Sequence, residues 1–261
     1  MNIMKTIFKV IRFFLIFFWG LFLYSCQKEK VLQAEAGLAR VNVINAVVTG
    51  GNAKVNVSAK KINWSSIRDN QALGGSTLNK MFIVPTDQST VFQVVPLSDT
   101  TNMWYNQVAQ LSEGKVYTWY LSGTPTDLKT VFQEESNFPD YVIRDAGKPT
   151  PSADSIVNIR FVNLSSSGPK LDINILNNTA LEANDLGYQQ FTDFKTYPAR
   201  TGMNTITFQI RNSADNSLVA TYTFSASSYR FKSVAVVVMG VYNTPGLSAL
   251  DNFRIVVVPY Q

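Results

Sequence analysis

The 261-residue sequence contains no histidine and a single cysteine, Cys26. Without histidine the chain lacks the most common general base of enzymes and the most common protein ligand of transition metals. One cysteine excludes an internal disulfide, and the lack of histidine also excludes a zinc site of the Cys/His type and a Ser-His nucleophile. A Ser-Lys arrangement and a hard-cation site built from carboxylates and carbonyl oxygens stay open on residue types alone.

The chain also has little excess charge outside its first residues. The formal net charge is +5, and Lys5, Lys9 and Arg12 contribute three of these charges with no acidic residue beside them. The remainder carries about +2, and no run of lysine or arginine longer than a pair follows residue 30. This is ordinary surface charge, so we expect no nucleic-acid partner.

An uninterrupted apolar run, FFLIFFWGLFLY, follows the basic residues and spans residues 13–24. A helix that crosses a bilayer needs roughly 20 apolar residues, so this run is short for a permanent membrane span. A basic start followed by a short apolar run is typical of a secretory signal peptide. The alternative is an uncleaved membrane helix that begins at Ile7.

The end of the apolar run, Leu23-Tyr24-Ser25-Cys26, resembles the lipobox of bacterial lipoproteins. In that family a leucine lies three residues before the cysteine, a small residue lies directly before it, and lipid is attached to the thiol. Tyr24 departs from this pattern, as in the looser lipoboxes of Bacteroidota-like proteins. The resemblance implies cleavage between Ser25 and Cys26 and acylation of Cys26, which would hold the chain on a membrane. The alternative is an unmodified cysteine within a signal peptide.

These features divide the N-terminal part into a signal peptide, residues 1–25, and a lipidated tether, residues 26–37. The tether sequence is polar and small, as expected for a flexible linker. The localisation that the resemblance implies is the outer membrane, with the protein facing either the periplasm or the cell surface.

The rest of the chain contains an internal repeat. ARVNVINAVVTGGNAKVNV, residues 39–57, is similar to VNIRFVNLSSSGPKLDINI, residues 157–175, and the similarity continues collinearly at an offset of about 113 to 118 residues. The aligned pairs include Asn45 with Asn163, Asn56 with Asp172, Pro85 with Pro198 and Gly123 with Gly240.

Each copy is built from short alternating runs rich in Val, Ile, Thr, Phe and Tyr. Alternation with a period of two predicts strands that bury one face and expose the other. The runs lie at residues 41–43, 55–57, 82–84, 91–95 and 117–121, and again at 159–161, 171–175, 206–210, 218–224 and 234–239, with a closing strand in FRIVVVPY. Six or seven short strands per copy predict an all-β chain of two tandem immunoglobulin-like β-sandwich modules.

The predicted modules span residues 38–137 and 154–261. Residues 138–153, rich in Pro, Asp, Gly and Ser, are interpreted as the linker between them.

The second copy is similar to the family called domain of unknown function 4397. The matching positions are Val162-Asn163, Pro169, Asp172 and Pro198-Ala199. In the first copy Asn56 takes the place of the aspartate and Pro85-Thr86 takes the place of Pro-Ala. The resemblance implies extracytoplasmic β-sandwich modules of bacterial lipoproteins and surface proteins, often in tandem, with no established activity.

The acidic residues give little support for catalysis. Glu134 and Glu135 are the only adjacent acidic pair, and neighbours on a strand point to opposite faces, so they are interpreted as a solvated edge rather than a glycosidase pair. A second set of acidic residues surrounds the linker without the dense spacing of a calcium loop, which leaves a cation between the modules as an alternative. This set is Asp127, Asp140, Asp145 and Asp154. We expect no catalytic residue, no bound metal and no cofactor.

Aromatic residues in polar loops are the candidate ligand surface. Trp64, Trp104 and Tyr105 lie in such loops, and exposed aromatic rings on sandwich loops stack on sugars or anchor partners. The alternative is packing beneath the loops. Thr100 and Ser155 follow aspartate in short segments that resemble the O-glycan acceptor motif of exported Bacteroidota proteins.

The sequence therefore predicts a membrane-anchored lipoprotein with a non-catalytic binding, adhesion or structural role toward a protein or glycan partner. The alternative is an accessory subunit or an enzyme that acts on extracellular polysaccharide.

Overall fold

The computed structural model describes residues 37–50, 52–75, 77–136, 138, 155–200, 202 and 204–260. The predicted signal peptide, the cleavage site at Ser25 and Cys26, and the predicted linker apart from Phe138 lie outside the described residues. Within the described ranges no helix is long and apolar enough to span a bilayer.

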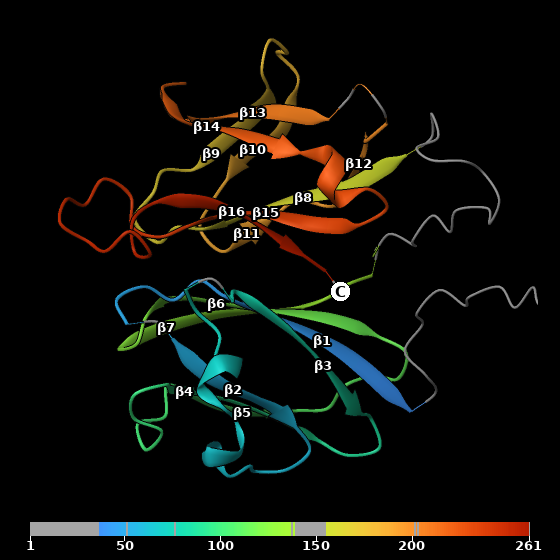
Figure 1. Ribbon diagram of the computed structural model, residues 1–261, viewed down its shortest axis with the longest axis vertical. Coiled ribbons are helices and arrows are strands. Elements are labelled where there is room, and N and C mark those ends of the chain that lie inside the picture. The colour runs from blue at the N-terminus through green and yellow to red at the C-terminus, as the bar shows by residue number, and fades with distance from the viewer. Residues whose placement is uncertain are drawn as a thin grey trace, which may run out of the picture. The chain divides into compact units, whose positions relative to one another are not determined.

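The first seven strands form two facing sheets, which we call the first sandwich (Figure 1). One sheet has the order β3-β1-β6-β7 and the other has the order β2-β4-β5, and two 3-10 helices, η1 and η2, lie between β2 and β3. The elements are β1 (Leu38–Asn45), β2 (Ala53–Ser58), η1 (Trp64–Ser66), η2 (Asp69–Gln71), β3 (Asn79–Pro85), β4 (Thr90–Pro96), β5 (Tyr105–Ala109), β6 (Val116–Thr124) and β7 (Asp127–Glu134).

The strands from β8 onward form the second sandwich in the same way (Figure 1). One sheet has the order β11-β8-β15-β16, with β12 also paired to β8, and the other has the order β10-β9-β13-β14. The elements are β8 (Ile156–Leu164), β9 (Leu171–Ile175), β10 (Leu181–Leu186), β11 (Gln190–Phe191), β12 (Lys195–Pro198), β13 (Thr205–Asn212), β14 (Leu218–Ser225), η3 (Ala226–Tyr229), β15 (Ser233–Met239) and β16 (Arg254–Pro259).

Each sandwich encloses its own hydrophobic core between its two sheets. Trp119 of β6 and Phe92 of β4 meet edge to face in the first core, and Phe161 of β8 and Phe208 of β13 do so in the second. Alternate residues of each strand supply these cores, as period-two alternation requires. The predicted all-β sandwich fold is confirmed.

The internal repeat is visible in the strand pairing. β1 runs parallel to β6 with Val41 opposite Tyr117, and β8 runs parallel to β15 with Ile159 opposite Val234. The aligned prolines also take equivalent places, because Pro85 ends β3 opposite Leu38 and Pro198 ends β12 opposite Ile156.

The aligned asparagines close the first strand of each copy in the same manner. Asn45 donates from Nδ2 to the carbonyl of Leu73, and its Oδ1 accepts from the amide of Val47. Asn163 donates to the carbonyl of Leu186 and accepts from the amide of Ser165. In both copies a buried asparagine side chain thus supplies hydrogen bonds to a backbone carbonyl and a backbone amide just outside the strand.

The alignment of Asn56 with Asp172 is wrong by two residues. Asn56 Nδ2 donates to Gln93 on β4 and to the carbonyl of Lys60, four residues on. Asn174 makes the same bonds, to Gln209 on β13 and to the carbonyl of Asn178. Asn56 therefore corresponds to Asn174. A slip of two residues keeps every side chain on the same face, so the alternating pattern alone could not exclude it.

The sequence pattern predicts that each strand exposes one face to solvent, and this prediction is wrong for four strands at the centres of their sheets. β1, β6, β8 and β15 are buried along almost their whole length, so both faces of each are covered. Their outer faces meet in a third core cluster that draws Ile44 and Tyr120 from the first sandwich and Val162, Val237 and Tyr260 from the second. The described parts of the two sandwiches therefore share a buried core.

Candidate functional site

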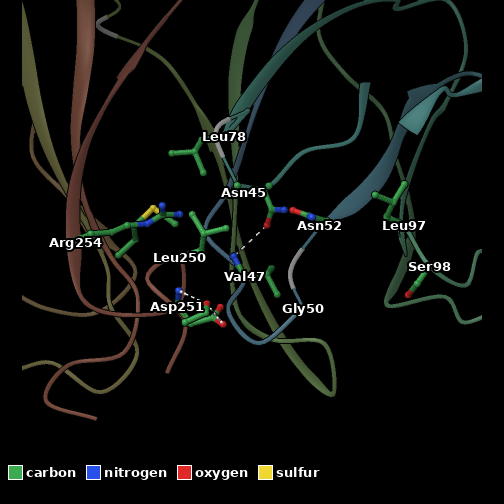
Figure 2. A pocket seen from close by; sticks show the side chains of 14 residues that line it. Asn45, Val47, Gly50, Asn52, Leu78, Leu97, Ser98, Leu250, Asp251 and Arg254 are labelled. Atoms are coloured by element: carbon green, nitrogen blue, oxygen red, sulfur yellow. Dashed lines mark hydrogen bonds between the residues drawn. The ribbon is translucent and has the colours of Figure 1, made fainter. Parts of the chain in front are cut away.

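A pocket of about 370 Å³ opens where the two sandwiches meet (Figure 2). The first sandwich contributes the end of β1 with the loop that follows it, the turn at Gly74 and Gly75, and the residues after β4. The second sandwich contributes Met239, Arg254 and the loop between β15 and β16. Sequence reasoning missed this site because its walls come from loops about 200 residues apart in the chain.

Asp251 joins the loops of the two sandwiches at this pocket. Its Oδ1 accepts a hydrogen bond of 2.6 Å from the backbone amide of Thr49, and its Oδ2 accepts one of 2.7 Å from the hydroxyl of Ser248. Thr49 adopts a positive φ of 57°, which is uncommon for a β-branched residue. The carboxylate therefore holds this wall in place, and both of its oxygens are already engaged.

Arg254, the first residue of β16, is the positively charged residue in the pocket lining. Its Nε is buried and has no hydrogen-bond partner in the described chain. Burial lowers the pKa of Arg254, and the nearby charge of Asp251 acts in the opposite direction. No described carboxylate forms an ion pair with it. Arginine remains protonated at neutral pH, so this wall carries a cation whose hydrogen-bonding capacity is incompletely used.

The rest of the lining is a mixture of polar and apolar side chains (Figure 2). Asn52, Ser98 and Ser248 supply amide and hydroxyl groups, while Leu78 and Leu250 supply apolar surface. Asn45 also lines the pocket, but its side chain already bonds to backbone groups in the way that Asn163 repeats elsewhere. We therefore assign Asn45 a structural role in the wall.

The predicted aromatic surface is not one assembled patch. Trp104 and Tyr105 are partly buried and pack on the core of the first sandwich, where the Tyr105 ring lies 5.2 Å from that of Trp119. Trp64 is partly buried in η1, where its carbonyl accepts from Lys54. Across the described residues no ring contact joins Trp64 to the other two. Neither Trp64 nor Trp104 lines the pocket between the sandwiches.

The two predicted O-glycan acceptors differ in exposure. Thr100 is partly buried in the turn after β4, where Asp99 accepts hydrogen bonds from the amide and hydroxyl of Thr101. Ser155 is 1% exposed. An attached glycan must reach solvent, so the folded chain corrects the interpretation of Ser155 as an acceptor in a surface loop.

The interpretation of Glu135 as part of a solvated edge is also wrong. Its side chain is 2% exposed and accepts 2.8 Å and 2.6 Å hydrogen bonds from Arg160 of β8 and Thr118 of β6. Glu134, by contrast, lies in the exposed ion pair with Lys115 that its strand position suggests.

Arg160 is the centre of a buried polar network between the sandwiches. Its Nη1 also donates to the hydroxyl of Tyr120, which in turn shares a 2.8 Å hydrogen bond with Tyr260. Its guanidinium lies 4.0 Å from the centre of the Phe194 ring, within cation–π range. Burial alone would lower the pKa of Arg160, but Tyr260, Tyr120 and Glu135 outweigh it and the net direction is upward. This network fastens the sandwiches together and is enclosed rather than open to a substrate.

A second hollow, of about 600 Å³, lies on the outer sheet of the second sandwich. Asn174, Gln209 and Arg211 form a hydrogen-bonded row at its base. The corresponding Asn56 and Gln93 of the first sandwich are buried. The hollow is wide and polar, and no unpartnered buried group among the described residues points to a ligand there.

The predicted inter-module cation finds no assembled ligand set in the described chain. Asp127 forms an exposed ion pair with Lys129, while Asp140, Asp145 and Asp154 lie outside the described residues. Among the described residues no group of three or more His, Cys, Asp or Glu side chains could hold a metal ion.

Comparisons with known proteins add the following. No family model matches the chain, and no curated protein matches it. Among solved structures, the family 41 carbohydrate-binding modules of streptococcal virulence factors, which recognise alpha-glucan, match at 14% identity and a TM-score of 0.23, covering 77% of this chain and 94% of that one. A streptococcal virulence factor that binds alpha-glucan matches at 11% identity and a TM-score of 0.24, covering 77% and 93%. A superposition this loose carries no argument about the ligand.

Proposed function

We propose that the chain is an outer-membrane lipoprotein, acylated at Cys26, whose two sandwiches act together as one non-catalytic binding unit for a small polar ligand or the end of a glycan. The lipid anchor is supported by Leu23, Ser25 and Cys26 and by the short apolar run before them. The assignment of the modules to the domain of unknown function 4397 is supported by Val162-Asn163, Pro169, Asp172 and Pro198-Ala199. Their tandem arrangement is supported by the repeated strand pairing.

The observation that carries the binding role is the pocket between the sandwiches. Small-molecule sites prefer concave places between domains and are usually preformed, with volumes of roughly 300–1,000 Å³. This pocket has a volume of about 370 Å³ and a wall fastened by Asp251, and the two sandwiches that form it share a buried core. A preformed site loses little conformational entropy when its ligand binds.

The anchor is tested by metabolic labelling with a fatty acid in a host that processes lipoproteins. We expect label on the wild-type protein and none on Cys26→Ala. Absence of label on the wild type, or label that persists in Cys26→Ala, would contradict the lipoprotein assignment. Protease treatment of intact cells then separates the two orientations, because loss of the protein indicates surface display and full protection indicates a periplasmic position.

The binding role is tested on a glycan array with the full chain. Ser98→Trp places a large ring at the exposed rim of the pocket, and Ser89→Trp places the same ring on an exposed loop outside the pocket lining. We expect binding that is lost in Ser98→Trp and kept in Ser89→Trp. Binding that is instead lost in Trp64→Ala or Trp104→Ala and insensitive to Ser98→Trp would move the site to the aromatic residues.

A further inference from the structure

Arg254 is the positively charged residue in the lining of the pocket between the sandwiches. We propose that this pocket binds a carboxylated, polyhydroxylated molecule of the uronic-acid class, with the guanidinium of Arg254 receiving the carboxylate. This inference rests on the binding role proposed above and names the class of ligand for the same pocket.

The case for an anion follows from the charge of Arg254. Arg254 is the positively charged residue of the pocket lining, and no described carboxylate forms an ion pair with its guanidinium. Asp251 does not serve as this counter-charge in the described structure, because its oxygens accept hydrogen bonds from Thr49 and Ser248 and it forms no ion pair with Arg254. A ligand carboxylate would supply acceptors to the planar guanidinium, which binds carboxylates in a bidentate manner.

Arg160 shows how this fold balances the charge of an arginine that it buries for stability. Arg160 has an acidic partner at 2.8 Å, a tyrosine hydroxyl and an aromatic ring over its guanidinium, although its Nε, like that of Arg254, has no hydrogen-bond partner in the described chain. Arg254 has no acidic partner among the described residues and lines an open pocket instead of a closed core. This difference in charge compensation indicates that the counter-charge of Arg254 comes from outside the chain.

The rest of the lining specifies the remainder of the ligand. Asn52 and Ser98 offer donors and acceptors for hydroxyl groups, and Leu78 and Leu250 offer surface for the carbon face of a sugar ring (Figure 2). The volume of about 370 Å³ is near the lower end of the range for ligand pockets, which favours one sugar residue over a length of polymer. That residue is either a free uronate or the terminal residue of an acidic glycan.

The test is isothermal titration calorimetry on the detergent-solubilised full chain with D-glucuronate and D-glucose, which differ in the carboxylate. We expect the wild type to bind glucuronate more tightly than glucose, with an affinity that falls as salt is added. Arg254→Gln should weaken glucuronate binding roughly 10- to 100-fold, the range expected for hydrogen bonds to a charged group, and should leave any weak glucose binding unchanged. Arg68→Gln, which makes the same change of charge at an exposed position, should bind glucuronate as the wild type does.

A third ligand, a short oligo-glucuronide, separates the two sources of the carboxylate. Tighter binding of the oligomer than of the monomer assigns the site to a glycan end, and tighter binding of the monomer assigns it to a free uronate. Equal binding of glucose and glucuronate by the wild type, or equal loss of glucuronate binding in Arg254→Gln and Arg68→Gln, would overturn the ligand class. Array binding that Ser98→Trp abolishes but Arg254→Gln spares would overturn this inference alone and leave the proposed binding role standing.

Discussion

Replacing Glu135 by glutamine should remove the negative charge that compensates Arg160 without creating a cavity. Breaking a buried ion pair by removing one partner costs about 3–5 kcal/mol, because the other charge stays buried without compensation. The side chains of Arg160 and Glu135 are 4% and 2% exposed, so solvent cannot replace the lost partner. We therefore expect the free energy of unfolding to fall by an amount in that range.

Urea unfolding followed by tryptophan fluorescence measures this loss, since Trp119 is buried in the first core. With a urea dependence of roughly 3 kcal/mol per molar, the transition midpoint should fall by about 1 M or more. The matched control is Glu134→Gln, the neighbouring residue, whose ion pair with Lys115 has side chains 43% and 49% exposed. Exposed pairs contribute little to stability, so its midpoint should stay close to that of the wild type.

A double-mutant cycle isolates the pair. Arg160→Met alone should also be strongly destabilising, because among the described residues Glu135 then keeps only the hydrogen bond from Thr118. The double variant Glu135→Gln/Arg160→Met should lose much less unfolding free energy than the two single variants lose together. Neither charge then remains buried without compensation. A midpoint for Glu135→Gln that matches the Glu134→Gln control, or losses that simply add in the double variant, would refute this account of the interface.

Two further predictions concern the buried tyrosines and a close backbone approach. Burial raises the pKa of Tyr260 and of Tyr120 above the ordinary value, so their protonated forms stabilise the folded state below about pH 10 and this stabilisation is lost as the pH rises further. Urea unfolding across this pH range should show that decline, with a shallower decline in Tyr260→Phe, and tyrosines that all ionise freely in the folded protein would contradict it. Gly240 has a φ of +89°, and a Cβ there would lie 2.1 Å from the carbonyl oxygen of Asn252, so Gly240→Ala should destabilise the fold well beyond the roughly 1–2 kcal/mol of a left-handed backbone alone. Gly50→Ala, with a φ of +93° and nothing within 4 Å, should show only that smaller cost in the same unfolding measurement, and equal losses would exclude the steric explanation.

The sequence was sufficient to predict most strands, because alternation directly encodes which side chains face a core. It missed β5, β7, β10, β11 and β12, which lie at sheet edges and bury few of their side chains. Exposed edge strands tolerate polar residues on both faces, so their alternation is weak. β14 was predicted although it is also an edge strand, because LVATYTF keeps an apolar residue at alternate positions.

The sequence does contain a signal for the contact between the sandwiches, but it was interpreted as an ordinary strand with one buried face. The run VAVVVM of β15 is apolar at consecutive positions, which is typical of a strand buried on both faces. Arg160 within β8 and the adjacent Glu134-Glu135 gave no indication of a buried pair, because residue type alone does not reveal a partner 25 residues away. The pocket at Arg254 was invisible for the same reason, since loops from both sandwiches create it.

The position of β1 within its sheet has a mechanical consequence. Leu38 begins β1, and β1 is hydrogen-bonded along its length to β3 on one side and to β6 on the other. A pull applied from the N-terminal side, as a membrane anchor would apply it, acts along the axis of this central strand. Both rows of hydrogen bonds are then loaded in shear and must fail together, whereas an edge strand peeled from its end would lose them one at a time. The chain thus presents a strand that is hydrogen-bonded on both sides to the direction from which tension would arrive.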